Sequence, residues 1–332
     1  MLRLLTSRRA ARCAPAEGEA WIFGKTPFCD DFIRRPDSRA EQSEFGAWLR
    51  AAGAVGVDRP GLVICTCFDN PNTAFSGIVE PSHDRAASGA RPHPLGVFQG
   101  CERARAWLRT IESGLRAWPS LVATGSALPQ CSSSDELFAV AQRFAAASTG
   151  DDPFAAAGSP ALPDQRSIDG LIEATLACGP SLEATGLAEL AGLLFTLTRV
   201  PPGESVRVPL GDCQSLEELR RRVWAWAGIL TVLDPRAGEV SLLCPKPPFA
   251  RGWLWLCRRP PRAHDARAFD PATAGGRFGW CTRDVLIDRP GTAEVDLARR
   301  DAFIARFLDR QGLDRSLHQV LTTLRAEPAL AG

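Results

Sequence analysis

The chain has 332 residues, of which 45% are hydrophobic and 23% are charged, and its formal net charge at pH 7 is +1. This length and composition are typical of a globular protein with a large core, built as one large domain or as two ordinary ones. The near-zero net charge provides no global field that would steer nucleic acid or an acidic membrane surface to the chain.

The eleven cysteines are scattered along the sequence, and no two of them form a CxxC pair. An odd number without regular spacing favours reduced, buried thiols, which indicates a cytoplasmic protein. The four histidines lie far apart and add no zinc pattern, so we expect neither a metal nor a cofactor. No segment approaches ~18 uninterrupted apolar residues, so we expect no insertion into a membrane.

Strand and helix patterns alternate in the first third of the chain. A capping box at Ser38–Glu41 opens a predicted helix, which we expect to stop at Gly53. A second helix is predicted over 101–118, and a capping box at Ser133–Glu136 opens a third that ends near Ala147. The predicted strands of this region are 21–23, 62–68, 75–79 and 95–98.

The second half of the chain begins after residues 146–167, which are rich in small residues, Gly and Pro and predict a flexible loop. A capping box at Ser215–Glu218 opens a predicted helix whose apolar residues recur at helical spacing. The other predicted elements are helices within 168–197, strands at 206–208, 239–244 and 252–257, and a helical tail from 293.

Helices interleaved with apolar strands predict a sheet covered on both faces, in an α/β or α+β fold of three layers. Neither half shows a complete set of strands by itself, so we expect one domain over residues 18–290. Residues 1–17 are basic, with an apolar patch too short for a secretory signal, and they predict a disordered extension or a start codon set too early. Residues 291–332 are expected to form a C-terminal helical extension.

The tripeptide Ser82-His83-Asp84 contains the residue types of a hydrolase triad. A working triad brings together side chains from separate parts of a fold, whereas adjacent side chains diverge, and no GxSxG elbow occurs in the chain. The preferred interpretation is a turn after a strand, in which Pro81 fixes φ and the Ser82 and Asp84 side chains bond backbone amides.

Gly24-Lys25-Thr26 resembles the end of a phosphate-binding loop, but position 19, where that loop needs glycine, is Glu19. Pro27 also follows at once and disfavours the helix that would hold a phosphate. The pair Asp30-Asp31 has no further acidic ligand nearby, so a salt-bridged surface loop is favoured over a metal site.

Two segments, FGKTPFCDDFIRRP from residue 23 and SGIVEPSHDRAASGARPHPL from residue 76, together resemble the TagF family of proteins associated with bacterial type VI secretion. The resemblance extends from about Trp21 to Phe98, and it departs from the family at Pro92-His93, where the family has a pair of aromatic residues. The first segment matches the family at Gly24, Lys25, Pro27, Asp31, Phe32, Arg34 and Arg35, followed by a helix with Trp48 and Leu49. The second matches it at Gly77, Pro81, Ser82, Asp84, Arg85, Arg91, Pro94 and Leu95.

The resemblance implies an α/β fold, a three-layer αβα sandwich around a central mixed sheet, without catalytic activity. It also implies a cytoplasmic repressor of type VI secretion that binds a forkhead-associated scaffold protein, and no nucleic acid. The alternatives are a hydrolase-like enzyme that uses Ser82 or a cysteine, and a structural accessory subunit of the secretion apparatus. We further hypothesise that Asp31 and Arg85, one from each segment, form an ion pair.

Overall fold

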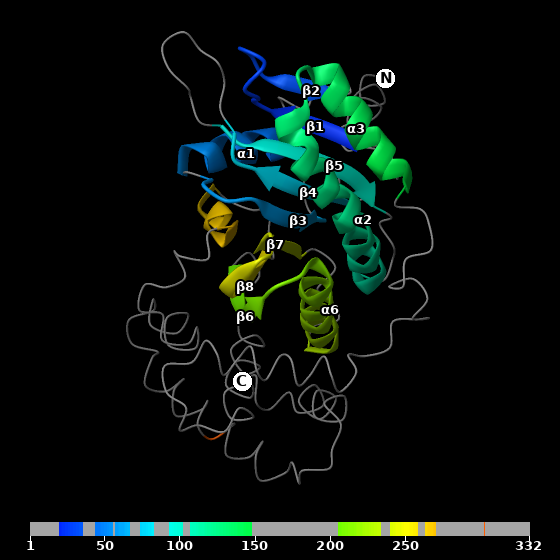
Figure 1. Ribbon diagram of the computed structural model, residues 1–332. Coiled ribbons are helices and arrows are strands. Elements are labelled where there is room, and N and C mark those ends of the chain that lie inside the picture. The colour runs from blue at the N-terminus through cyan, green and yellow to red at the C-terminus, as the bar shows by residue number, and fades with distance from the viewer. Residues whose placement is uncertain are drawn as a thin grey trace, which may run out of the picture. The chain divides into compact units, whose positions relative to one another are not determined.

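The computed structural model describes residues 20–35, 44–55, 57–66, 74–82, 93–101, 107–147, 205–233, 240–257, 263–269 and 302. The chain divides into two compact units, and the first comprises Met1–Pro160, Gly238–Lys246 and Arg259–Asp270. Its strands are β1 (Ala20–Gly24), β2 (Ile33–Arg35), β3 (Gly61–Cys65), β4 (Ala74–Glu80), β5 (Leu95–Cys101) and β7 (Ser241–Pro245) (Figure 1). Its helices are α1 (Glu44–Val55), α2 (Trp107–Ala127) and α3 (Ser134–Ala147), with 3-10 turns η2 (Leu128–Gln130) and η3 (Ala263–Phe269).

The strands of the first unit form a sheet in the order β2-β1-β5-β4-β3-β7. Every pairing given for the described strands is antiparallel, so these pairings do not show the parallel component of the expected mixed sheet. The strands β3, β4 and β5 follow one another in the chain and lie next to one another, an arrangement that connections reversing the chain produce. All five residues of β3 are buried, as its continuous apolar run predicts.

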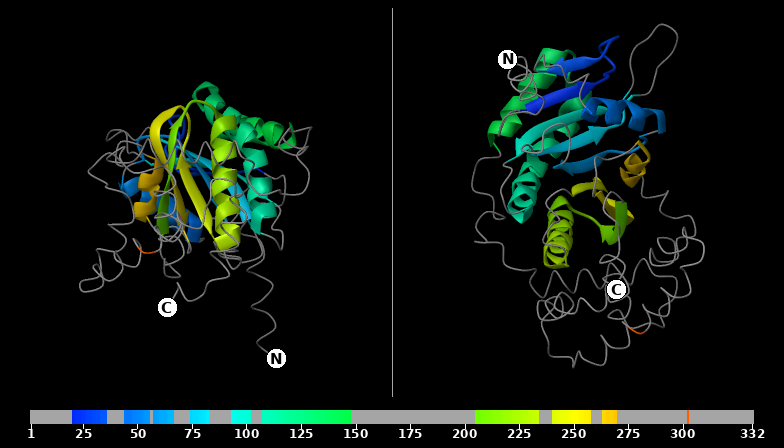
Figure 2. Two further views of the ribbon diagram at one scale, coloured as in Figure 1. Left: turned by 90° about the horizontal axis from the view of Figure 1, so that it is seen from below. Right: turned by 180° about the vertical axis from the view of Figure 1, so that it is seen from behind.

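Helices contact both faces of this sheet (Figures 1 and 2). The Ser76 hydroxyl of β4 donates to the Gly114 carbonyl of α2 at 2.9 Å. A Cβ added to Gly96, which pairs with Val79, would meet Leu49 of α1 at 3.4 Å. Because side chains alternate along a strand, Ser76 and Val79 point to opposite faces of the sheet. These contacts agree with the predicted α/β character of the fold.

The ends of two helices differ from the prediction. Helix α1 continues through Gly53 to Val55, because Gly53 provides space for a close neighbour and does not cap the helix. A Cβ at Gly53 would lie 2.7 Å from Cδ of Pro94. Helix α2 begins at Trp107, not at 101, because Cys101 still belongs to β5 and pairs with Ala74, and the helix runs past 118 to Ala127.

The capping box predicted at Ser133–Glu136 is confirmed. The Glu136 backbone N–H donates to the Ser133 hydroxyl at 3.2 Å, and the carboxylate of Glu136 accepts the Ser132 N–H at 2.8 Å. These bonds satisfy free amides at the beginning of α3, where no earlier helical turn supplies acceptors. The end of α3 at Ala147 also agrees with the prediction.

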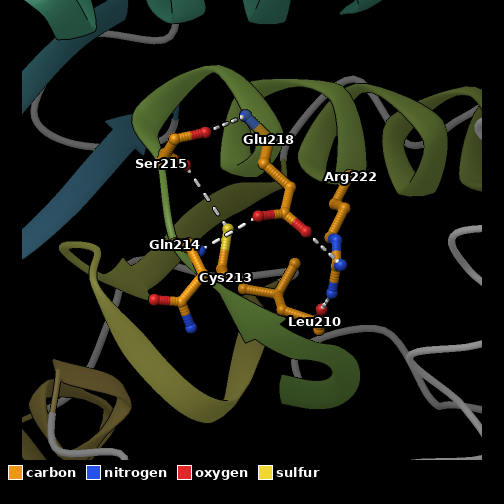
Figure 3. Close-up of polar contacts among 6 residues, drawn as sticks. All are labelled: Leu210, Cys213, Gln214, Ser215, Glu218 and Arg222. Atoms are coloured by element: carbon orange, nitrogen blue, oxygen red, sulfur yellow. Dashed lines mark hydrogen bonds and ion pairs between the residues drawn. The ribbon is translucent and has the colours of Figure 1, made fainter.

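The second unit comprises Ala161–Ala237, Pro247–Arg258 and Pro271–Gly332. Its described elements are the antiparallel strands β6 (Ser205–Cys213) and β8 (Phe249–Cys257) and the helix α6 (Leu216–Leu233). The predicted capping box opens α6, because the Glu218 N–H donates to the Ser215 hydroxyl at 3.2 Å (Figure 3). Glu218 also accepts the Gln214 N–H at 3.0 Å and pairs with Arg222. The apolar positions predicted to face inward are buried: Leu219, Val223, Trp226 and Leu230.

Several predictions fall outside the described residues, and the domain boundaries stay predictions as well. The residues concerned are 1–17, the capping box at 38–41, most of the loop at 146–167, the helices within 168–197, and the tail from 291 apart from Ala302. Within the described part of the chain, no helix has the length and apolar character needed to span a bilayer.

Candidate functional site

The two segments that resemble one family meet at one end of the sheet. Strand β1 ends at Gly24 and pairs there with Leu95, the first residue of β5. Leu95 also pairs with Glu80, the last residue of β4, and Gly24 pairs with Ile33, the first residue of β2. We call this end of the sheet the motif edge and define it as the described residues 24–34, 80–82 and 93–95.

Gly24 lies where the two segments come closest. Its φ of +143° is a conformation that favours glycine. A Cβ at this position would lie 2.4 Å from the Pro94 carbonyl oxygen and 2.7 Å from Cα of Leu95. Both the backbone conformation and the space therefore require glycine here, and the first segment needs this residue to reach the second.

After Gly24 the chain forms a turn and then enters β2. The Cys29 N–H donates to the Thr26 carbonyl at 3.3 Å, which places Pro27 at the second position of a four-residue turn, a position that proline favours. The Asp31 carboxylate accepts the N–H of Phe32 at 2.7 Å and fixes the entry into the strand. No helix follows Gly24-Lys25-Thr26, so the geometry of a phosphate-binding loop is absent from this described segment.

Side chains from the two segments contact one another in an aromatic cluster, which consists of Phe23, Phe32 and His93. The ring of Phe32 stacks on Phe23 with centroids 5.7 Å apart, and it meets His93 edge to face at 4.6 Å. The Lys25 ammonium lies 5.0 Å from the centroid of Phe32, within the range of a cation–π contact. The chain departs from the family pattern here, because Pro92-His93 stands in place of an aromatic pair, and His93 supplies the one aromatic ring of the two positions.

The imidazole of His93 is only 8% exposed. Its Nδ1 lies 2.7 Å from the Pro94 carbonyl oxygen, so Nδ1 carries the hydrogen and donates. Burial lowers the pKa of His93 below its ordinary value of 6.5, and the nearby charges of Lys25 and Arg50 lower it further, against the opposing bond to Pro94. His93 is therefore neutral near pH 7, with an unprotonated Nε2.

Two buried polar atoms of the motif edge have no hydrogen-bond partner among the described residues. They are Nε2 of His93 and the hydroxyl oxygen of Thr26, whose side chain is 1% exposed. A buried polar atom without a partner is unfavourable by about 1–3 kcal/mol, so these two atoms are available to a hydrogen-bonding group outside the described residues. No pattern in the sequence predicts the burial of Thr26, because hydroxyl side chains next to a proline turn are usually exposed.

The second segment reaches the motif edge through Ser82 and His93. The His93 N–H donates to the Ser82 carbonyl at 2.9 Å, which closes the connection from β4 to β5 where these strands end. The predicted site residues Asp84, Arg85 and Arg91 lie outside the described residues, as does His83. The proposed ion pair between Asp31 and Arg85 therefore stays a hypothesis.

The arginines of the first segment lie on β2. Arg34 pairs in register with Phe23, and its side chain is partly exposed. Arg35 forms an ion pair with Asp135 of α3 at 2.6 Å, with exposed fractions of 38% and 83% for the two side chains. Exposed pairs of this kind contribute little to stability, so this one orients α3 against β2 more than it stabilises the unit.

An ion pair at the motif edge was not predicted. The ammonium of Lys246, directly after β7, lies 3.3 Å from the carboxylate of Glu80. Burial raises the pKa of Glu80, and the charge and hydrogen bond of Lys246 oppose this rise. Glu80 stands one residue before the recognised Pro81-Ser82, but its partner is far away in sequence, so only the strand register brings the pair together.

Two buried cysteines of the described residues, Cys213 and Cys131, have raised pKa values. Burial raises the pKa of the Cys213 thiol to about 12, and burial also raises the pKa of Cys131. A raised pKa keeps a thiol protonated and unreactive. Among the described residues, no group of three or more His, Cys, Asp or Glu side chains could hold a metal ion.

No protein-family model matches the chain. No curated protein matches it either. Among solved structures, the chain is similar to PA0076 from Pseudomonas aeruginosa PAO1, with 14% sequence identity and a TM-score of 0.38 over 76% of this chain and 94% of that one.

Proposed function

We propose that the chain is a non-enzymatic regulatory protein of a bacterial type VI secretion system and that it resembles TagF. In this proposal its fold is a three-layer αβα sandwich, and it acts in the cytoplasm without a cofactor. It represses the assembly or activity of the secretion system by binding a forkhead-associated scaffold protein. The motif edge is the proposed binding surface.

The observation that carries the proposal is the convergence of the two family-like segments at the motif edge. The segments are separate in sequence, yet Phe32 of the first contacts His93 of the second at 4.6 Å. Gly24 of the first also leaves no room for a side chain beside Pro94 of the second. If the two segments form one binding surface of the family, they must lie next to each other in the fold. Two chance matches to the family pattern would not be expected to lie together.

The chemistry of the motif edge supports binding over catalysis. His93 uses Nδ1 to bond Pro94, and its ring packs against Phe32. The carbonyl of Ser82 is engaged by the backbone of His93. The exposed residues Pro27, Asp30 and Asp31 present a rigid turn and two carboxylates to a partner. Aromatic and charged groups on a fixed turn are suitable for specific recognition.

The proposal is tested by deleting the gene and measuring secretion of a type VI effector under repressing conditions. We expect secretion to rise on deletion and to fall again when the wild-type gene is restored. The His83→Ala variant should repress like wild type, whereas a folded Asp31→Arg variant, which reverses an exposed charge of the motif edge, should fail to repress. Secretion that is unchanged by deletion, under both inducing and repressing conditions, would refute the proposal.

Variants expressed in the deletion strain separate the two alternative functions, a hydrolase-like enzyme and a structural subunit. Loss of repression in a folded Ser82→Ala variant, with an unaltered partner interaction, would favour a hydrolase-like enzyme. A stoichiometric amount of the protein in purified secretion apparatus would favour a structural subunit. A repressor is expected in substoichiometric amounts and outside the assembled apparatus.

A further inference from the structure

Lys246 is held at two points where the chain leaves the first unit. It is one of only two lysines in the sequence, and the next residue, Pro247, belongs to the second unit. Its backbone N–H donates to the Pro60 carbonyl at 3.0 Å, next to the start of β3. Its ammonium lies 3.3 Å from the Glu80 carboxylate at the end of β4. The chain is thus fixed immediately before it enters the second unit.

Glu80 connects this anchor to the motif edge. It pairs with Leu95, which pairs in turn with Gly24, so one residue of β5 lies between Glu80 and the first segment. Pro81 and Ser82 follow Glu80 directly. A displacement of the β4 end, where the second segment begins, therefore moves the carboxylate that holds Lys246.

The pair is enclosed on the side of α2. The side chains of Glu80 and Lys246 are 14% and 19% exposed. A Cβ on Gly125 of α2 would lie only 2.4 Å from the Glu80 carboxylate oxygen and 2.9 Å from Cδ1 of Ile78. The carboxylate therefore has little room on this side for an alternative position. Burial disfavours the ionised form of Glu80 and the charge of Lys246 opposes this effect, so loss of either side chain removes an interaction that stabilises its mostly buried partner.

We propose that the Glu80–Lys246 ion pair is a latch that couples the motif edge to the chain segment entering the second unit. A change at the motif edge that displaces Glu80 releases the side chain of Lys246, which leaves its backbone bond to Pro60 in place, and loosens the chain from Pro247 into β8. The coupling is reciprocal, so loosening of that segment also loosens the motif edge. The inference does not depend on the proposed function, because it needs no partner protein.

The latch is tested by hydrogen exchange, read by mass spectrometry, on the full chain as wild type, Glu80→Gln, Lys246→Met and the double variant. Removing the charge of Glu80 is expected to speed exchange in peptides covering 249–257, on the far side of the pair. Lys246→Met is expected to speed exchange in peptides covering 93–101. We expect changes of about tenfold, within the range that contacting residues give in double-mutant cycles. The double variant should change less than the product of the single changes.

The exposed pair Arg35–Asp135 provides the matched control, since Asp135→Asn also removes an ion-pair carboxylate and should leave exchange in 249–257 unchanged. If Lys246→Met does not fold, exchange in peptides covering 249–257 of Glu80→Gln still tests the latch. Changes confined to 74–82 in Glu80→Gln and to 240–257 in Lys246→Met, multiplying in the double variant, would overturn the latch. A negative result in the secretion experiment would contradict the proposed function but not the latch, so the two proposals can be told apart.

Discussion

Phe32 and His93 contact each other edge to face, with ring centroids 4.6 Å apart and their planes at 85°. One residue comes from the segment after β1 and the other from the segment before β5. Edge-to-face contacts of this kind add about 0.5–1.5 kcal/mol to the burial of the rings. The contact joins the two segments through side chains, in addition to the backbone pairing of Gly24 with Leu95.

Replacing Phe32 by alanine is expected to destabilise the protein by about 3 kcal/mol, as large-to-small changes of packed aromatic residues do. The variant loses the stacking on Phe23, the contact with His93 and the cation–π contact of Lys25. Urea denaturation measures the difference. The control is Phe28→Ala in the neighbouring turn, where no ring contact occurs among the described residues and the loss should be about 1 kcal/mol or less. Equal losses of unfolding free energy in the two variants would contradict a stabilising role of the aromatic cluster.

Replacing Gly24 by alanine should destabilise the protein by about 3 kcal/mol or more, because strain and a clash act together. The positive φ is unfavourable for alanine, and the new Cβ would lie 2.4 Å from the Pro94 carbonyl oxygen. The melting temperature shows the effect directly. The exposed Asp58→Ala variant should shift stability by no more than about 0.5 kcal/mol. A Gly24→Ala variant as stable as Asp58→Ala would disprove the close approach.

The neutral state of His93 predicts a pH dependence of stability. Because burial lowers the pKa of His93 in the folded protein, the unfolded chain binds the proton more readily. The stability that His93 contributes is present above its ordinary pKa of 6.5 and is lost as the pH falls through that value towards the folded pKa. His93→Asn removes this loss. Urea denaturation at about pH 8 and about pH 5.5 should show wild type losing more stability than the variant on acidification; equal losses would contradict the prediction.

The thiol of Cys213 should resist alkylation in the folded protein. Its pKa is raised to about 12 by burial and by the Glu218 carboxylate, against the opposing charge of Arg222 (Figure 3). Cys29, which is partly exposed, should be alkylated before Cys213 when native protein is treated with iodoacetamide and mapped by mass spectrometry. Both cysteines should react alike in urea. Rapid native labelling of Cys213 would contradict the raised pKa and would revive the alternative of a cysteine nucleophile.

Local sequence signals predicted the parts of the fold that depend on neighbouring residues. The capping boxes at Ser133–Glu136 and Ser215–Glu218 form as expected, because their hydrogen bonds lie within one helical turn. The strand ending at Gly24 is also confirmed, since glycine alone suits the conformation there. These features need no knowledge of the distant chain.

Features that depend on tertiary contacts were not predictable in the same way. Gly53 was expected to end α1, but it instead makes room for Pro94 on a distant strand end. Glu80 and Lys246 form a pair only because β3 lies between β4 and β7 in the sheet. The motif residues could be recognised from the sequence, but their contacts with one another required the strand register.

The central claim is that the motif edge binds a forkhead-associated scaffold protein, and calorimetric titration of that protein into the full chain tests it most directly. The decisive variant is Asp31→Arg, which reverses an exposed charge at the motif edge; because it also removes the bond from the Phe32 N–H, urea denaturation first checks that the variant is folded. The control is Arg143→Asp, a charge reversal at an exposed site of α3 next to Gln142, whose side chain donates to the Ala20 carbonyl at the other end of β1. We predict that wild type and Arg143→Asp bind equally and that Asp31→Arg binds about tenfold more weakly. No binding by wild type, or equal binding by all three proteins, would contradict the account.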